Sequence, residues 1–259
     1  MNATRRTMNV TRLIATGAML LPMIAACGAS DVVSPAYACS TAGLNGSYGM
    51  QRNGQTAPGT VTTSVGLVVF DGKGNYSVQQ TVSVNGTPTT LPPASGSYVV
   101  NSDCTGSESD ASGKVISTLA VVHGGDEVLG ISVVPGSSMT VHFERVTGAC
   151  SNATITGDYA FQRNGQAGGG IALVALGTIT FDGKGSQFVG QTIDRGGTIT
   201  TVSNLVGTYT INADCSGTQF DPGLGKVISS IIVVHGGDQI LGMSTTQGNN
   251  VVLHYERLK

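Results

Sequence analysis

The chain has 259 residues, of which only 11 % are charged, and its 13 basic and 15 acidic side chains give a net charge of −2. This balance lacks the basic excess of nucleic-acid-binding proteins and excludes nucleic acid as an expected partner. The 38 glycines, the absence of tryptophan and the wealth of Ser, Thr and Val predict an all-β protein.

Residues 1–27 have the pattern of a signal segment. Arginines precede a mostly apolar run at residues 13–26, which is too short for a transmembrane helix but typical of a secretory signal. The run ends at Ala26-Cys27-Gly28, which resembles a bacterial lipoprotein signal and makes Cys27 the expected lipidation site. Residues 28–38 would then be a tether, and the lipid would be the only membrane contact. Cleavage after Ala38, at an A-x-A pattern, is the alternative and predicts a secreted protein.

Beyond the tether, the sequence consists of two tandem repeats. Gln51-Arg52-Asn53-Gly54-Gln55 returns at residues 162–166, an offset of 111 residues. His123-Gly124-Gly125-Asp126 returns at residues 235–238, an offset of 112. We therefore expect two copies of one fold, residues 39–146 and 150–259, joined by a link so short that the copies pack together.

Turn signals divide each copy into seven or eight short strands. In the first copy we expect strands at residues 48–52, 61–70, 76–84, 96–101, 115–123, 127–134 and 139–146, with one more after Cys104. Consecutive hairpins in this number favour closure, because a closed barrel has no exposed edge. The predicted fold is two tandem antiparallel up-and-down β-barrels of about eight strands each.

The cysteines indicate export. One pair falls in each copy, with its two members 65 positions apart, and the simplest pairing is Cys39–Cys104 and Cys150–Cys215. Such disulfides require an oxidising compartment. No C-x-x-C pair exists, so neither a metal site nor a cofactor is expected.

One segment of each copy has a family resemblance. Gly96-Ser97-Tyr98 leads into Asp103-Cys104-Thr105-Gly106, residues 207–217 repeat this pattern, and Phe-Asp-Gly-Lys-Gly precedes both. These motifs resemble those of bacterial exported proteins with an allene oxide cyclase barrel-like domain, and the resemblance covers each copy nearly end to end. It implies a small, calycin-like eight-stranded barrel. No catalytic motif of the plant cyclases is matched, so it implies no activity.

Charged side chains that recur in both copies are the candidate ligand-binding residues. They are Arg52 and Arg163, Arg145 and Arg257, His123 and His235, Asp126 and Asp238, His142 and His254, and Glu144 and Glu256. No residue stands out as catalytic.

The His-Gly-Gly-Asp motif predicts a two-residue hairpin loop in which His123 and Asp126 form a cross-strand pair. This pair is interpreted mainly as a turn-closing contact, with an acid–base unit as the alternative. On the last strand, alternation places His142 and Glu144 on one face and Arg145 on the other, beside Val141 and Phe143. If that second face is the inner one, Arg145 and Arg52 could either close the barrel with ion pairs or bind an anionic ligand.

The segment at residues 115–122 is apolar on both faces, as is its counterpart at 231–234, so a second surface should cover it. The other copy or another chain is the expected partner. We favour a non-enzymatic envelope protein, structural or binding a small apolar or anionic ligand. The alternatives are a cofactor-free isomerase or cyclase and an adhesion or assembly module. The isomerase or cyclase alternative loses its best candidate residues if His142 and Glu144 point outward.

Overall fold

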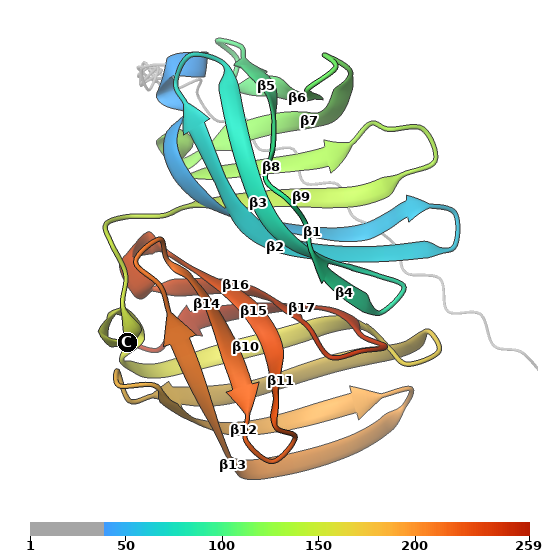
Figure 1. Cartoon of the computed structure of the whole chain (residues 1–259), viewed down its shortest axis with the longest axis vertical. Coiled ribbons are helices and arrows are strands. Elements are labelled where there is room, and N and C mark those ends of the chain that lie inside the picture. The colour runs from blue at the N-terminus through green and yellow to red at the C-terminus, as the bar shows by residue number, and fades with distance from the viewer. Residues whose placement is uncertain (1–38) are drawn as a thin grey trace, which may run out of the picture. The chain divides into compact units, whose positions relative to one another are not determined.

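Buried and exposed side chains alternate along most strands, so each strand turns one face inward and one outward. The computed structural model describes residues 39–259, which form two closed, eight-stranded antiparallel barrels in tandem (Figure 1). The predicted fold class is confirmed. The signal segment, the tether, Cys27 and the cleavage site after Ala38 lie outside the described residues. No helix within residues 39–259 has the length and apolar character needed to span a membrane.

The first barrel follows the predicted strand order. Its strands are β1 (Asn45–Ala57), β2 (Thr60–Asp71), β3 (Asn75–Val84), β4 (Thr87–Thr90), β5 (Ala94–Val100), β6 (Thr105–Asp110), β7 (Val115–Val122), β8 (Glu127–Ser132) and β9 (Ser138–Arg145). Eight of these strands form the ring, which the pairing of β2 with β3 closes, whereas β4 pairs with β3 alone. The first strand was expected to end at Asn53-Gly54 but continues to Ala57, because Gly54 at φ +146° keeps an extended path.

The second barrel repeats the ring. Its strands are β10 (Gly157–Ala167), β11 (Ile171–Phe181), β12 (Ser186–Arg195), β13 (Thr198–Ile211), β14 (Ser216–Asp221), β15 (Lys226–Val234), β16 (Gln239–Ser244) and β17 (Asn250–Arg257). Here β13 takes the place of both β4 and β5. Pro92 and Pro93 interrupt the first copy between β4 and β5, because proline has no N–H for the ladder.

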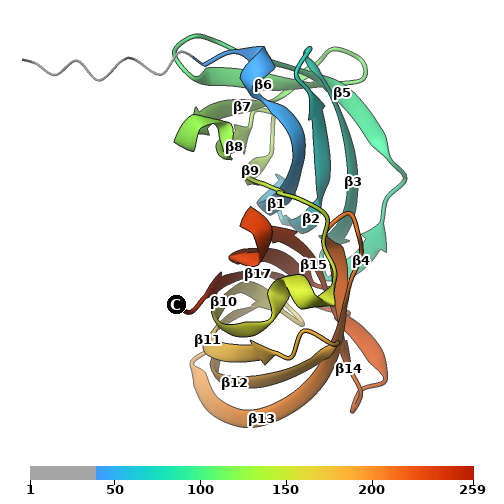
Figure 2. The same cartoon turned by 90° about the vertical axis from the view of Figure 1, so that its left-hand side faces the viewer.

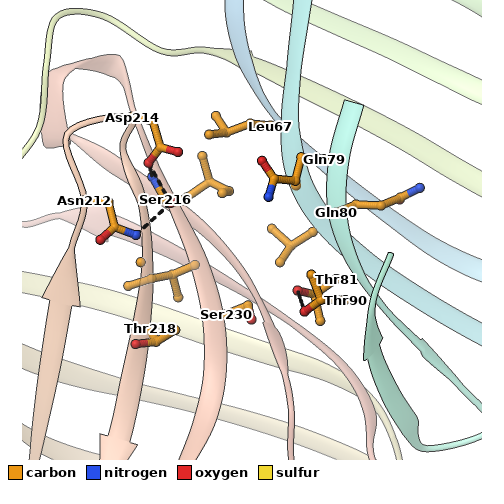
Figure 3. A pocket seen from close by; sticks show the side chains of 15 residues that line it. Leu67, Gln79, Gln80, Thr81, Thr90, Asn212, Asp214, Ser216, Thr218 and Ser230 are labelled. Carbon is orange, nitrogen blue, oxygen red and sulfur yellow. Dashed lines mark hydrogen bonds between the residues drawn. The ribbon is translucent and has the colours of Figure 1, made fainter. Parts of the chain in front are cut away.

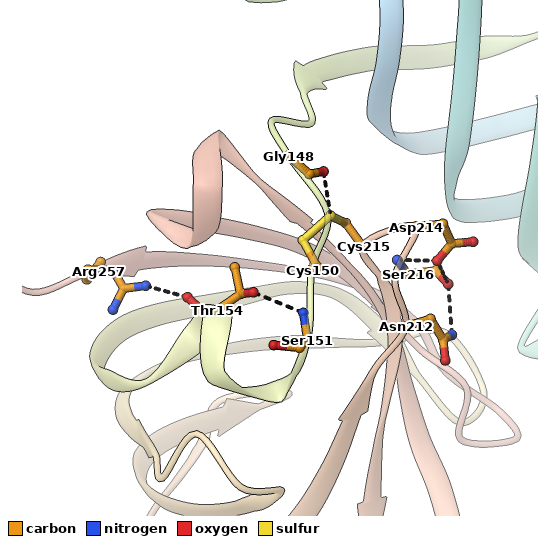
Figure 4. The surroundings of a disulfide bond; sticks show 9 residues. All are labelled: Gly148, Cys150, Ser151, Thr154, Asn212, Asp214, Cys215, Ser216 and Arg257. Carbon is orange, nitrogen blue, oxygen red and sulfur yellow. Dashed lines mark hydrogen bonds between the residues drawn. A yellow bond between two sulfur atoms is a disulfide. The ribbon is translucent and has the colours of Figure 1, made fainter.

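Short 3-10 turns lie at one end of each barrel. They are η1 (Thr41–Gly43) and η2 (His123–Gly125) in the first barrel, and η3 (Asn152–Ile155) and η4 (His235–Gly237) in the second. The predicted disulfides Cys39–Cys104 and Cys150–Cys215 are confirmed at this end. Each one ties the segment that enters the barrel to a turn on the opposite side of the ring (Figure 4).

Aromatic rings fill the centre of each barrel. Phe70 lies at 4.8–6.1 Å, between ring centroids, from four other rings, those of Tyr48, Tyr76, Tyr98 and Phe143. Phe181 has the same place in the second barrel, beside Tyr159, Tyr209 and Tyr255. Most of these rings pack edge-on or tilted, as aromatic quadrupoles favour. Each lumen is therefore a packed core through most of its length.

The two barrels, within residues 39–259, belong to one compact unit and contact each other through unlike faces (Figure 2). Val65 and Leu67 of β2 pack on the outward side chains of β15 and β16, which are Ile232, Val234, Leu241 and Met243. In the second copy the apolar outer face thus lies against the first copy. In the first copy the equivalent face, with Ala120 on β7, is exposed.

Candidate functional site

Arg145 and Arg257 cap the turn-bearing end of their barrels. The guanidinium of Arg145 lies 4.7 Å from the Tyr48 ring centre, binds the Asp126 carboxylate at 2.7 Å and donates to two backbone carbonyls, those of Asn45 and Gly125. Arg257 repeats these contacts with Tyr159 and Asp238. Burial, partly opposed by Arg145, raises the pKa of Tyr48 to about 12, so the ring stays neutral. These arginines are structural caps whose donors are already in use.

Arg52 and Arg163 enter the lumen from the other direction. The register pairs Tyr48 with Arg145 and Arg52 with Val141, so Arg52 lies four residues further along the barrel, roughly 13 Å away. The hypothesis that Arg52 and Arg145 converge on one anionic head-group is therefore wrong. Each barrel instead has a capping arginine and a separate lumen arginine.

In the first barrel the lumen arginine has an internal counter-ion. Arg52 Nη2 lies 3.7 Å from Glu108 Oε2, and the Glu108 side chain is 0 % exposed. Burial raises the pKa of Glu108 while the positive charge of Arg52 opposes that shift. A buried carboxylate of this kind is tolerated when a cation neutralises it.

In the second barrel this counter-ion is missing. Gln219 stands where the first copy has Glu108, and its amide is held by Gln187 Oε1 at 2.9 Å and by the Tyr255 hydroxyl at 2.8 Å. Among residues 39–259, no carboxylate lies within ion-pair distance of Arg163. Its Nε is buried without a hydrogen-bond partner, as is that of Arg52, so the ion pair alone distinguishes the two arginines. The guanidinium lies 5.1 Å from the Phe161 ring centre, which leaves its charge only partly compensated.

Both lumen arginines line a small cleft at the barrel mouth. The cleft of the second barrel has a volume of about 200 Å³, and that of the first about 240 Å³. Leu173, Ile228 and Val251 form an apolar part of the wall beside Arg163, and Ser229, Ser244, Thr246, Asn249 and Asp221 form a polar part. The Asp221 carboxylate accepts from the Leu224 N–H group and is not an ion-pair partner of Arg163. A cation without a paired carboxylate beside apolar side chains fits a small anion with an apolar body.

A chain of imidazoles and carboxylates runs along the contact between the barrels. His123 Nδ1 lies 2.7 Å from Glu127, His142 Nε2 lies 2.9 Å from Glu127 and 3.0 Å from Glu144, and His235 Nε2 lies 2.5 Å from Glu144. The last of these contacts joins the two barrels. The second copy has Gln239 in the place of Glu127, so His235 has no equivalent anion on its own barrel and pairs with Glu144 instead.

These contacts overturn the prediction that His123 and Asp126 form a pair across the turn. His123 and Asp126 do not form a cross-strand pair, because four residues separate β7 from β8 and the closing pair is Val122 with Glu127. His123 adopts φ +49°, which takes its side chain out of the ladder, and Asp126 binds Arg145. The same shift applies to His235 and Asp238.

His142 and Glu144 point outward, because Val141 and Phe143 fill the lumen. The isomerase alternative thereby loses the residues on which it depended. In the second barrel His254 bonds Glu256 at 2.9 Å, and that carboxylate is 54 % exposed.

Glu127, His142 and Glu144 place three potential metal ligands within 4.8 Å of one another. These atoms already bond one another, which describes a proton-sharing chain more closely than an open ligand set. Burial alone would lower the pKa of His142, but hydrogen bonds and charge from Glu144 and Glu127 raise it above its usual value of 6.5. Burial would raise the pKa of Glu144, but His142 and His235 lower it below its usual value of 4.5.

These two shifts predict a pH optimum of stability. The raised pKa of His142 gives stability that is complete below pH 6.5 and is lost as the pH rises through the folded-state pKa. The lowered pKa of Glu144 gives stability that is complete above pH 4.5 and is lost as the pH falls through its folded-state pKa. We therefore expect the unfolding free energy to be highest between about pH 4.5 and 6.5 and to fall by up to about 1 kcal/mol on either side.

Urea unfolding at a series of pH values measures this optimum. Glu144→Gln should flatten both limbs of the profile, whereas Glu256→Gln, at the exposed counterpart, should leave them in place. An unchanged profile in Glu144→Gln would contradict the assignment.

A polar groove of about 230 Å³ lies beside the contact between the barrels, lined by β2, β3 and β4 on one side and by β14 and β15 on the other (Figure 3). Its polar groups are largely bonded to one another. Asp214 accepts from the Ser216 hydroxyl at 2.6 Å, Asn212 donates to Ser216 at 3.0 Å, and the hydroxyls of Thr81 and Thr90 share a bond. The groove presents no free cation and is a weaker ligand site than the cleft at Arg163.

Fold and site thus define a disulfide-bonded tandem β-barrel of exported type, in which Arg163 has no ion-pair partner among the residues that the structure describes. No family model and no curated protein matches the chain. Among solved structures, kievitone hydratase from Nectria haematococca is 10 % identical, with 82 % of this chain and 89 % of that chain covered and a TM-score of 0.29. A protein of unknown function from the DUF3598 family of Nostoc punctiforme is 10 % identical, with coverages of 86 % and 99 % and a TM-score of 0.26. Likenesses this distant assign no activity.

Four residues of the lumen and of the imidazole–carboxylate chain were not among the sequence candidates. Glu108 and Gln219 occupy one repeat position, and a carboxylate in one copy replaced by an amide in the other was visible in the sequence. Glu127 and Gln239 show the same exchange. Both positions stand out because the residue differs between the copies, whereas the sequence candidates are residues that the two copies have in common.

Proposed function

We propose that this protein is an exported, non-enzymatic tandem β-barrel that binds a small organic carboxylate at the mouth of its second barrel. The observation that carries the proposal is the exchange of Glu108 for Gln219. It leaves Arg163 as a lumen cation without an internal counter-ion, while Arg52 keeps one. A bound carboxylate would provide that counter-ion with charge-assisted hydrogen bonds.

The size and wall of the cleft limit the ligand. An engineered cavity of roughly 150 Å³ holds benzene, so about 200 Å³ suits a carboxylate with a short aliphatic or single-ring body. Leu173, Ile228 and Val251 would contact that body, and the guanidinium of Arg163 would hold the head-group. Aromatic packing beneath Arg163 blocks deeper entry, because Phe161 and Tyr255 are buried there.

The test is titration of the full chain with hexanoate and benzoate by isothermal calorimetry, with hexanol and benzyl alcohol as uncharged probes. We expect one site per chain for the acids and at least tenfold weaker binding of the alcohols, since a hydrogen bond to a charged group contributes roughly 1.5–3 kcal/mol. Arg163→Gln should weaken acid binding by a similar factor.

Substitutions at the equivalent positions 108 and 219 distinguish ligand binding in the cleft of one barrel from binding in the cleft of the other. Gln219→Glu gives Arg163 an internal carboxylate and should abolish binding, whereas Glu108→Gln frees Arg52 and should raise the stoichiometry from one to two. Glu108→Asp is the matched control and should leave one site. Equal binding of acids and alcohols, or unchanged binding in Gln219→Glu, would overturn the proposal.

The disulfides indicate an oxidising, extracytoplasmic location. We further propose attachment to the cell envelope through a lipid on Cys27, and membership of the allene oxide cyclase barrel-like group, which the eight-stranded closed topology supports. Mass spectrometry of the protein from its host tests the anchor. A lipidated N-terminal peptide that begins at Cys27 is expected, and a mature protein that begins at Cys39 would contradict it.

A further inference from the structure

The contact between the two barrels joins unlike faces of the same fold. The first barrel contributes its β1–β2 face, defined by the outward residues Gly49, Gln51, Val65 and Leu67. The second barrel contributes its β15–β17 face, defined by Ile232, Val234, Leu241, Met243 and Val252. Because the barrels are copies, each carries both kinds of face. The contact therefore leaves one face of each kind unused.

Both unused faces retain apolar character and are exposed. On the β7–β9 face of the first barrel, Leu129 and Ile131 are 46 % and 56 % exposed, whereas their counterparts Leu241 and Met243 are fully buried. On the β10–β11 face of the second barrel, Leu176 is 67 % exposed, whereas its counterpart Val65 is 2 % exposed.

Polar contacts fix the register of the existing contact. Gln51 Nε2 donates to the carbonyls of Gly242 and Leu253 at 2.8 and 2.9 Å. The unused faces keep the same groups: Gln162 is exposed on β10, and the paired residues Gly130 and Val141 present the equivalent carbonyls on β8 and β9. A loop contact, from Gly248 N–H to Gly86 O at 2.7 Å, has its counterparts in Gly136 and Gly197.

The ion pair across the contact is retained as well. Glu144 of the first barrel meets His235 Nε2 of the second. Their counterparts are Glu256 on the second barrel and His123 on the first, which are 54 % and 75 % exposed. His123 binds Glu127 through Nδ1, so the Nε2 atom that His235 uses is not engaged in that bond.

Some side chains of the two unused faces differ in size from their counterparts on the two faces that are in contact. A Cβ on Gly49 would lie 2.7 Å from Val234 and 3.0 Å from Ile232, so the used contact requires glycine there. The unused pair has Ala160 in place of Gly49 and Leu176 in place of Val65, but it has Ala120 in place of Ile232. The smaller Ala120 makes room for Leu176, whereas Val122 keeps the size of Val234, so the Ala160 methyl group requires a small displacement of the Val122 side chain.

From this correspondence we infer that a second copy of this chain docks its β10–β11 face on the β7–β9 face of the first copy. This contact between two chains would repeat the contact that joins the two barrels within one chain. Such a contact is head-to-tail and leaves the same two faces free at the ends. Further copies add until the assembly closes into a ring or continues as an open chain. The carboxylate cleft at Arg163 is not part of either face.

Two variants of the full chain test the inference by sedimentation equilibrium. Leu176→Asp blocks the β10–β11 face, and Ile131→Asp blocks the β7–β9 face. Both positions are exposed, so neither change burdens the fold. The mass of the wild-type chain should rise with concentration above that of one chain, and each variant alone should remain a single chain. An equimolar mixture should form a dimer and nothing larger, because it contains one intact face of each kind.

Val99→Asp is the matched control, since Val99 is 54 % exposed on β5, outside both faces, and should assemble like the wild type. Glu256→Gln should weaken association without changing the fold. A wild-type chain that stays single up to roughly 1 mM, where even weak interfaces associate, would overturn the inference. Loss of assembly in only one of the two blocking variants would also overturn it, because that outcome indicates a symmetric dimer.

Discussion

Replacing Ile232 by aspartate is expected to separate the two barrels. Ile232 is 4 % exposed and packs with Val65, Val234, Leu241 and Met243 on the contact between the copies. A carboxylate there would be buried among apolar side chains without a cation, a change that costs about 3–5 kcal/mol. Because each barrel has its own aromatic core and disulfide, we expect the barrels to part while each remains folded.

The measurement combines urea unfolding with limited proteolysis of the link at residues 147–149. The variant should lose unfolding free energy and be cut at the link much faster than the wild type. Ala120→Asp is the matched control, because the same position in the first copy is exposed and should cost no more than about 0.5 kcal/mol. Equal effects of the two variants would show that the covered face does not hold the barrels together.

Removal of one disulfide is expected to have the second large effect. The Cys150–Cys215 pair spans 65 residues, and closing a loop of that size contributes about 4 kcal/mol by restricting the unfolded chain. The pair of substitutions Cys150→Ser and Cys215→Ser should lower the melting temperature of the second barrel by roughly 15–30 °C, since about 1 kcal/mol corresponds to 4–8 °C in a domain near 100 residues.

The first barrel provides the internal comparison. Its Cys39–Cys104 pair has the same sequence separation, so Cys39→Ser with Cys104→Ser should lower the melting temperature of that barrel by a similar amount. Cys27→Ser removes no disulfide of either barrel and should leave both melting temperatures unchanged. A loss under about 1 kcal/mol on removal of either disulfide would mean that the unfolded chain is already restricted by other contacts.

Prediction succeeded where the chemistry is local. Asn85-Gly86 predicts its turn because both residues take positive φ, and Asp71 predicts a hairpin because its carboxylate accepts from Lys73 and Asn75 N–H groups in the same loop. The His-Gly-Gly-Asp motif was misread, since a 3-10 turn and a two-residue hairpin loop are both compatible with two glycines.

The repeat by itself determined the two barrels, their strand order and their disulfides, because register, turns and loop closure depend on residues near one another in sequence or on their count. The tertiary structure decided which faces meet, which arginine is compensated and which histidine finds a carboxylate. Those outcomes depend on single exchanges between the copies, such as Glu108 with Gln219 and Ala120 with Ile232, and on side chains more than 90 residues apart, such as Glu144 and His235. Their energies come from burial and from charge neutralisation in a shared environment, which strand periodicity does not encode.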